Sequence, residues 1–391
     1  MIHRQLSAKI LEDSSKYPVI SITGPRQSGK TTLAKKIFPN KKYTNLENYE
    51  DRTFAISDPR GFLFQSQEGI IIDEIQHIPE LFSYIQVISD EIDDPGYFII
   101  TGSHNFALLE NISQSLAGRV SVFLLLPFSL QELSDAELQV QTLEGSMYKG
   151  FYPRLHDKKI EASRYYNNYI QTYIERDVRN IKSIHDLNVF QTFLKLCAGR
   201  VGQLVNFSSL ADDAGINHNT AKSWLSILET SYIIYTVRPH YQNFNKRLVK
   251  MPKMFFYDTG LLSALLGICS KDELSNHHLK GNIFENFVIS ELIKSRVHIG
   301  ALPRCFFWRD KHGKEVDCLM EKGQQLIPIE IKAGNTIASD YFKNLNYYTN
   351  LANISAESSY IIYGGNYNQN RSYGKVRSWR CLQDTNFELF F

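Results

Sequence analysis

The sequence has little of what marks a membrane-spanning, secreted or cysteine-metal protein. Its 391 residues include only five cysteines, an odd number that is nowhere spaced as metal ligands. The most apolar stretch, Val120 to Phe128, is too short to cross a bilayer. The N-terminus carries Arg4 and Lys9 without a long apolar run, which is not the pattern of a secretory signal. We therefore expect buried, reduced thiols, no membrane partner and a cytoplasmic location.

The sequence also lacks a dominant charge. Its 43 basic and 41 acidic residues leave a net charge of +2, so nothing attracts the whole chain to nucleic acid. Any binding to DNA must then depend on local basic patches. The chain is too long for one small core, and its 43% hydrophobic content is typical of a well-packed protein of two or three domains.

A phosphate-binding loop is the most informative motif present. It reads Gly24-Pro25-Arg26-Gln27-Ser28-Gly29-Lys30-Thr31 and is followed by Thr32. An apolar run (18–22) precedes it and a helix-forming run (32–38) follows, which is the strand–loop–helix context that binds phosphate. The two glycines let the backbone wrap the phosphates, Lys30 reaches the β- and γ-phosphates, and the Thr31 hydroxyl ligates Mg²⁺. The motif predicts binding of a nucleoside triphosphate with Mg²⁺.

Two further strands supply the remaining parts of a nucleotide site. Residues 69–74 form an apolar strand that ends in Asp73 and Glu74. We expect Asp73 to hold Mg²⁺ through water and Glu74 to orient or deprotonate the attacking water. The strand at 97–101 leads to Ser103, a candidate sensor of the γ-phosphate, although a simple polar strand end is the alternative. No Gly-x-Ser-x-Gly elbow surrounds Ser103, so a nucleophilic serine is not indicated.

Arg119 stands just before the apolar strand at 120–126. It is a candidate to supply positive charge to the transition state, in its own site or in that of a neighbour in a homo-oligomer. The alternative is an exposed arginine favoured by a helix dipole.

The hydrophobic pattern predicts an α/β fold with a distinct middle region. Strands near 18–23, 43–46, 69–74, 97–101 and 120–126 alternate with helical patterns to about residue 145, which predicts a parallel sheet covered on both faces. A helical stretch follows at 160–179, with tyrosines expected to pack against a neighbour: Tyr165, Tyr166, Tyr169 and Tyr173. Residues 187–257 read as three helices and two strands, the order of a winged helix, with Asn217 capping the third helix.

The middle region also holds the most basic segment. No acidic residue lies between Glu229 and Asp258, a stretch that includes Lys253. The candidate DNA contacts are Lys222 on the outer face of the third helix, and Arg238, Lys246, Arg247 and Lys250 in the basic segment. The alternative is a lid or a protein-contact surface.

A second group of chemical side chains lies between residues 282 and 332. It comprises Glu285 on a helix, Asp317 on one strand, and Glu330 and Lys332 on the next strand. Strand alternation places Glu315 on the same face as Asp317. We expect Asp317 and Glu330 to bind a divalent metal that polarises a phosphodiester, with Lys332 positioning or deprotonating the water. A solvated face of salt bridges is the alternative.

Taken together, these motifs resemble those of the prokaryotic AAA-type ATPases that join an N-terminal ATP-binding domain to a C-terminal domain of unassigned function with a restriction-endonuclease-like core. The resemblance covers nearly the whole chain and rests on residues 24–31, 70–76, 101–103, 116–119, 127–129, 173–178 and 308–332. It implies ATP as the nucleotide. It also matches Lys30, Thr31, Asp73 and Glu74 to the ATPase site, and Glu285, Asp317, Glu330 and Lys332 to a nuclease-type site.

The resemblance and the pattern predict four parts. They are a P-loop AAA-like ATPase domain (1–150), a helical linker or lid (151–186), a winged-helix domain (187–257) and a restriction-endonuclease-like α/β domain (258–391). The motif at Arg176-Asp177 is expected to form an interdomain ion pair. We expect an Mg²⁺-dependent ATPase whose nucleotide state gates a DNA-directed C-terminal domain with a nuclease-like site. The alternative is an ATP-operated switch or scaffold that binds DNA or protein without cleavage.

Overall fold

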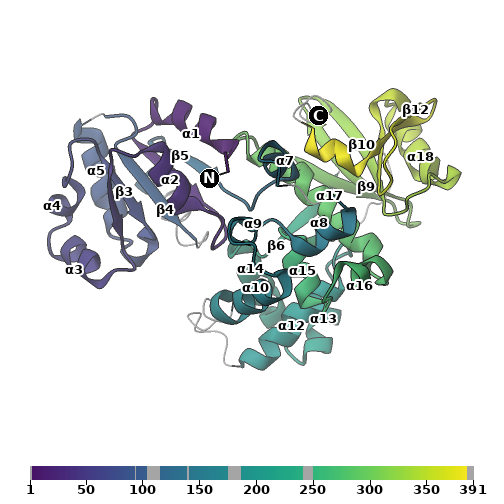
Figure 1. Cartoon of the computed structure of the whole chain (residues 1–391), viewed down its shortest axis with the longest axis horizontal. Helices are drawn as coiled ribbons and strands as arrows, with labels where there is room; N and C mark the ends of the chain where they lie inside the picture. Colours follow the sequence, from purple (N-terminus) through teal and green to yellow (C-terminus); the bar gives the residue numbers. More distant parts are fainter. Residues whose placement is uncertain are drawn as a thin grey trace. The chain divides into compact units, whose positions relative to one another are not determined.

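The chain forms two compact units (Figure 1). The computed structural model describes residues 2–92, 94–103, 115–138, 141–174, 186–240 and 250–384. The N-terminal unit runs to Phe128 and includes short segments at 230–232 and 297–301, while the C-terminal unit holds the rest.

The N-terminal unit is built on a five-stranded parallel sheet. Its strands are β1 (Val19–Thr23), β2 (Lys42–Asn45), β3 (Ile70–Asp73), β4 (Phe98–Gly102) and β5 (Val120–Leu124). Their spatial order is β2-β3-β4-β1-β5, and every neighbouring pair is parallel. All five strands fall where the sequence predicted them, and the predicted parallel sheet is confirmed. The carboxyl ends of β1, β3 and β4 therefore meet at one edge, where the predicted nucleotide residues are located.

Helices cover both faces of this sheet. They are α1 (Leu6–Ser14), α2 (Lys30–Ile37), α3 (Tyr49–Ser57), α4 (Pro59–Leu63) and α5 (Leu81–Ile92). Alternation along β3 explains the two layers, because Ile70 and Ile72 pack with α3, α4 and α5 while Ile71 packs with α1 and α2. A strand buried on both faces has a continuous apolar sequence, which is why β3 could be predicted from the sequence.

The C-terminal unit contains an eight-stranded mixed sheet. Its strands are β6 (Ile234–Pro239), β7 (Lys253–Phe256), β8 (Cys305–Arg309), β9 (Glu315–Lys322), β10 (Gln325–Lys332), β11 (Tyr360–Tyr363), β12 (Gln369–Arg371) and β13 (Gly374–Ser378). The spatial order is β12-β13-β11-β10-β9-β8-β6-β7. The antiparallel pair of β9 with β10 brings the predicted acidic residues of the two strands to neighbouring positions.

Eleven α-helices of the described residues lie in or begin in this unit. They are α7 (Leu130–Asp135), α8 (Leu143–Lys149), α9 (Pro153–Asp157), α10 (Ala162–Tyr169), α12 (Leu187–Gly199), α13 (Phe207–Ala214), α14 (His218–Thr230), α15 (Thr259–Leu265), α16 (Lys271–Asn276), α17 (Lys280–Val297) and α18 (Lys343–Ala352). A π-helical turn, Ile170–Ile174, continues α10. Within the described ranges, none of the helices combines the length and apolarity that a bilayer crossing requires.

The three helices and two strands of the middle region are present in the predicted order. Gly215 ends α13 in the left-handed conformation, and the Asn217 side chain accepts a hydrogen bond from the Thr220 amide at 2.8 Å. Strand β6 continues this region into the larger sheet, because it pairs in parallel with β8. The predicted boundary at residue 257 thus falls inside one compact unit, and the division into four domains and the winged helix stay predictions.

The tyrosines of α10 are packed as expected, whereas one cysteine is not buried. Tyr165, Tyr166 and Tyr169 are buried and pack around the ring of Tyr152, as expected of packing residues. The expectation of buried thiols was wrong for Cys269, which is exposed in the turn before α16. Arg176 and Asp177, and with them the proposed interdomain ion pair, lie outside the described residues.

Candidate functional site

The P-loop needs glycine at its first position for a steric reason. Gly24 has a φ of +144°, and a Cβ added to it would lie 2.2 Å from the carbonyl oxygen of Leu125. Gly29, with a φ of +96°, immediately precedes α2. Both backbone conformations strain any side-chain-bearing residue, so the two glycines allow the loop to wrap tightly before the helix begins.

Lys30 is held inside this loop. Its side chain is 5% exposed, and its ammonium donates hydrogen bonds to the carbonyl oxygens of Gly24 at 3.0 Å and Pro25 at 2.9 Å. A bound phosphate would offer this ammonium anionic oxygens in place of neutral carbonyls, which is a stronger interaction.

Thr31 and Asp73 meet as the motifs predicted. The Thr31 hydroxyl donates to Asp73 Oδ2 at 2.7 Å, across the contact between α2 and the end of β3. Two further hydroxyls donate to the same carboxylate: Tyr43 to Oδ2 at 2.9 Å, and Thr101 to Oδ1. A hydroxyl beside a carboxylate is an oxygen-donor set of the kind that Mg²⁺ prefers. These residues therefore fit the predicted metal position.

Glu74 follows Asp73 in a left-handed backbone conformation, with a φ of +55°. Its Oε2 accepts hydrogen bonds from Ser103 at 3.1 Å and from the Gln76 amide. Burial would raise the pKa of Glu74, but the charges of Lys30 and Arg26 and the hydrogen bonds from Gln76 and Ser103 lower it below its usual value. The Glu74 carboxylate is thus ionised at neutral pH, and Ser103 lies in the same group.

Three residues support this site without having been singled out as site residues. The guanidinium of Arg4 is buried and donates to the carbonyl oxygens of Ser28 at 2.9 Å and Leu126 at 2.6 Å, so it ties the P-loop to the segment after β5. Tyr43 and Thr101 hold the Asp73 carboxylate from the flanking strands β2 and β4. Only the strand order could have revealed Tyr43, because nothing local marks it.

Arg119 lies at the other end of the sheet. Its carbonyl accepts from the amide of Val19, the first residue of β1, whereas the P-loop follows the last residue of that five-residue strand. Since each strand residue advances about 3.3 Å, roughly 15 Å separates the two ends. The guanidinium pairs with Asp90 at 2.5 Å. The proposed action of Arg119 in its own site is therefore wrong, and a role in a neighbouring molecule's site stays a prediction.

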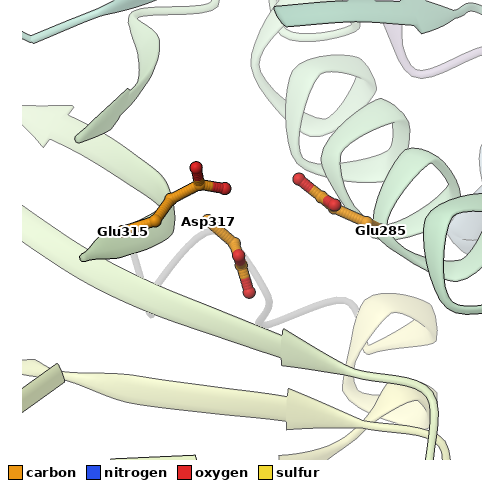
Figure 2. Close-up of side chains that lie close together, drawn as sticks. All are labelled: Glu285, Glu315 and Asp317. Atoms are coloured by element: carbon orange, nitrogen blue, oxygen red, sulfur yellow. The ribbon is translucent and has the colours of Figure 1, made fainter. Parts of the chain in front are cut away.

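The C-terminal unit brings three carboxylates together. Glu285 comes from α17, and Glu315 and Asp317 come from β9. One ligand oxygen from each of the three lies within 4.8 Å of the others. Figure 2 shows the Glu285 and Glu315 side chains reaching toward each other from helix and strand, with Asp317 beside Glu315. We name these three residues the acidic cluster. The predicted set included Glu285 and Asp317, and Glu315 was placed on the correct face without being chosen.

Glu330 and Lys332 of β10 adjoin this cluster. Lys332 Nζ lies 2.5 Å from Glu330 Oε2 and 3.2 Å from Asp317 Oδ2, and the Ile331 amide donates to Asp317 at 2.8 Å. Burial raises the pKa of Glu330 well above its usual value, and the Asp317 charge adds to that effect. Burial would raise the pKa of Asp317, but Lys332 and Lys253 lower it.

The sequence analysis was furthest from the structure in its prediction for Lys253. It was grouped with a basic surface segment, yet its side chain is 3% exposed. Its ammonium pairs with Glu285 at 2.8 Å and also contacts Glu315. Burial would lower the pKa of Lys253, but Glu285, Glu315 and Asp317 raise it above its usual value. Lys253 is therefore a charged member of the site rather than a surface contact.

The remaining candidate DNA contacts are only partly described. Lys222, Arg238 and Lys250 are exposed, and Lys222 lies on α14. Lys246 and Arg247 lie outside the described residues.

Comparison with known proteins covers most of the chain. Residues 16–134 match the model of an AAA domain, residues 140–272 match a domain of unknown function (DUF8612), and residues 280–382 match another (DUF4143). Two curated relatives, the uncharacterized proteins Mb2031c of Mycobacterium bovis and Rv2008c of Mycobacterium tuberculosis, are each 30% identical over 336 residues, which is 85% of this chain and 74% of theirs.

Solved structures show more distant likenesses. The Walker-type ATPase PABY2304 of Pyrococcus abyssi is 15% identical with a TM-score of 0.44, over 67% of this chain and 94% of its own. The RuvB Holliday junction branch migration motor of Thermotoga maritima is 17% identical with a TM-score of 0.29, over 59% and 87%. Scores of this size add nothing to what the sheet order and the AAA match establish.

Proposed function

Because the chain belongs to the family of the mycobacterial proteins Mb2031c and Rv2008c and carries an AAA domain, we propose that it is an Mg²⁺-dependent ATPase. We further propose that its nucleotide state gates a DNA-directed C-terminal site that cleaves phosphodiester bonds with a divalent metal. The observation that carries the ATPase proposal is the convergence of Lys30, Thr31, Asp73 and Glu74 at one edge of a parallel sheet.

Each residue of the nucleotide site has a distinct task in this proposal. Lys30 neutralises phosphate charge, and Thr31 and Asp73 would hold Mg²⁺, which supplies charge stabilisation to the phosphates. Glu74 orients the attacking water. The pKa of Glu74 is lowered, so its carboxylate is ionised at neutral pH and can accept a hydrogen bond from that water.

The nuclease part of the proposal is supported by the acidic cluster and its neighbours. Glu285, Glu315 and Asp317 offer hard oxygen donors of the kind that Mg²⁺ and Mn²⁺ accept. The bound ion would polarise the phosphodiester. Lys332, in contact with Asp317 and Glu330, would position the water.

The direct test is a cleavage assay on plasmid, linear duplex and single-stranded DNA. Each substrate is incubated with Mg²⁺ or Mn²⁺, with and without ATP. We expect metal-dependent cutting by the wild type and a loss of at least about 100-fold, or about 2.7 kcal/mol, for Asp317→Asn and for Lys332→Ala. Asp340→Asn changes an exposed acid outside the cluster and should cut normally. Gating predicts that Lys30→Ala abolishes any effect of ATP on the rate.

The rival function is a nucleotide-operated switch that binds DNA or protein without cutting. One observation favours it: two ammonium groups, Lys253 and Lys332, already neutralise part of the acidic cluster. Absence of cleavage with every substrate and metal would contradict the nuclease proposal and support this rival.

DNA binding has a separate test in its salt dependence. We expect Lys222→Ala, Arg238→Ala and Lys250→Ala together to reduce the slope of log affinity against log salt by about 3, because each removes about one phosphate contact. A matched control replaces three other exposed lysines, Lys271, Lys322 and Lys343. Fluorescence anisotropy with a labelled duplex measures both. Equal slopes in the two triple variants would remove the middle region as the DNA surface.

A further inference from the structure

The acidic cluster already contains a cation that belongs to the chain itself. The ammonium of Lys253 contacts Glu285 and Glu315, two of the three cluster carboxylates, and its side chain is almost wholly buried. A phenylalanine ring, Phe307, lies beneath it, with the ammonium 5.6 Å from the ring centroid. The ammonium therefore stands among the carboxylates from which a divalent ion would draw its ligands.

The electrostatic balance explains why a cation is needed there. Burying a charged group costs several kcal/mol unless an opposite charge lies next to it. The three carboxylates of the acidic cluster lie together, and Glu330 adjoins them through Lys332. Among the described residues, Lys253 and Lys332 are two lysines that contact this group. Lys332 serves Asp317 and Glu330, which leaves Lys253 as the partner of Glu285 and Glu315, apart from a contact of Glu315 with Arg309 at 3.1 Å.

Lys253 reaches the cluster from a different region than the acids do. It is the first residue of β7, where it pairs with Val237 of β6 on one side and forms a bridge to Leu204 on the other. These backbone pairings fix its position within the middle region, which matches the family domain at 140–272. The acids all belong to the family domain at 280–382. The site is therefore composite, and a shift of β7 would change the charge inside it.

We propose that Lys253 is the resident cation of the acidic cluster and competes with a divalent metal ion for Glu285 and Glu315. The middle region then sets the metal affinity of the C-terminal site. The Lys253 ammonium on β7 must move away before a metal ion can bind both Glu285 and Glu315. This inference rests on the proposed metal site and adds its regulation.

The test is a titration of the full chain with Mn²⁺, in which electron paramagnetic resonance measures the concentration of free Mn²⁺. All variants carry Asp73→Asn, so that the P-loop does not contribute, and no nucleotide is added. Lys253→Met keeps the length of the side chain and removes its charge. We expect it to bind Mn²⁺ at least about tenfold more tightly, equivalent to about 1.4 kcal/mol, while Lys253→Arg remains like the parent. Adding Glu285→Gln and Glu315→Gln to Lys253→Met should remove the gain.

A second measurement keeps Lys253 in place and does not depend on how a variant folds. Acylation by an amine-reactive ester, read by peptide mass spectrometry, should leave Lys253 protected in the metal-free protein. Mn²⁺ should make it reactive, since displacement exposes the ammonium. Protection that persists at saturating Mn²⁺, or equal Mn²⁺ affinity in a folded Lys253→Met protein, would overturn the proposal.

The Mn²⁺ titration distinguishes failure of the metal site from failure of the competition by Lys253. If the parent binds Mn²⁺ at the cluster but Lys253→Met changes nothing, the metal site stands and only the competition is wrong. If neither binds Mn²⁺ at millimolar concentration, the metal site of the proposed function fails, and the inference fails with it.

Discussion

Replacing Lys30 by alanine is expected to weaken ATP binding by at least about 100-fold, which corresponds to about 2.7 kcal/mol, and to reduce hydrolysis to background. The reason is that Lys30 supplies a buried ammonium inside the P-loop, where it donates to two loop carbonyls. Hydrogen bonds between charged groups are worth more than neutral ones, and the alanine variant leaves the phosphates without this partner. Isothermal titration with ATP and Mg²⁺, together with a phosphate-release assay, measures both effects.

The matched control for this variant is Lys36→Ala. Lys36 lies on the same helix, α2, but its side chain is exposed. It should bind and hydrolyse ATP like the wild type. Thermal melts of both variants show whether either has lost its fold. Wild-type affinity in a folded Lys30→Ala protein would contradict the placement of the phosphates in this loop.

Replacing Glu74 by glutamine should separate binding from hydrolysis. We expect kcat to fall by roughly 100- to 1,000-fold, in the range seen for groups that position or activate a nucleophile, while ATP affinity changes little. Glutamine retains the shape of the side chain and its contacts with Ser103 and Gln76 but loses the charge that attracts the water. Single-turnover hydrolysis and ATP titration give the two numbers.

The pH profile of the wild type adds a check on the same residue. Since Lys30 and Arg26 keep the pKa of Glu74 below its usual value despite burial, Glu74 stays ionised in the folded protein across the neutral range. Protonation of Glu74 should therefore not slow hydrolysis between about pH 6 and 8.

The control for the Glu74→Gln variant is Glu80→Gln, which changes an exposed acid a few residues further along the chain and should leave kcat unchanged. An equal kcat in Glu74→Gln and wild type would show that another group orients the attacking water.

The nucleotide site was accessible from the sequence because its parts are local. Gly24, Gly29 and Lys30 act within one loop, and the loop's shape follows from the φ angles that only glycine adopts easily. Asp73 and Glu74 end a strand whose unbroken apolar run shows that it is buried on both faces. Such a signal needs no knowledge of distant neighbours.

The neighbours of these residues could be identified only from the order of the strands in the sheet. Tyr43 and Thr101 reach Asp73 because β2 and β4 flank β3, and no local pattern distinguishes either residue. Arg119 failed as a partner of its own P-loop for the same kind of reason. It precedes a parallel strand, so it lies at the amino end of the sheet while the phosphates belong at the carboxyl end.

The C-terminal site divides in the same way. Alternation along β9 and β10 placed Glu315 with Asp317 and Glu330 with Lys332 from the sequence alone, since side chains two apart on a strand share a face. Lys253 looked like one more exposed base in a basic segment. Only the tertiary structure, by pairing β7 between β6 and Leu204, turned Lys253 inward against Glu285 and Glu315. A buried ammonium is stable there because these partly buried carboxylates lie next to it.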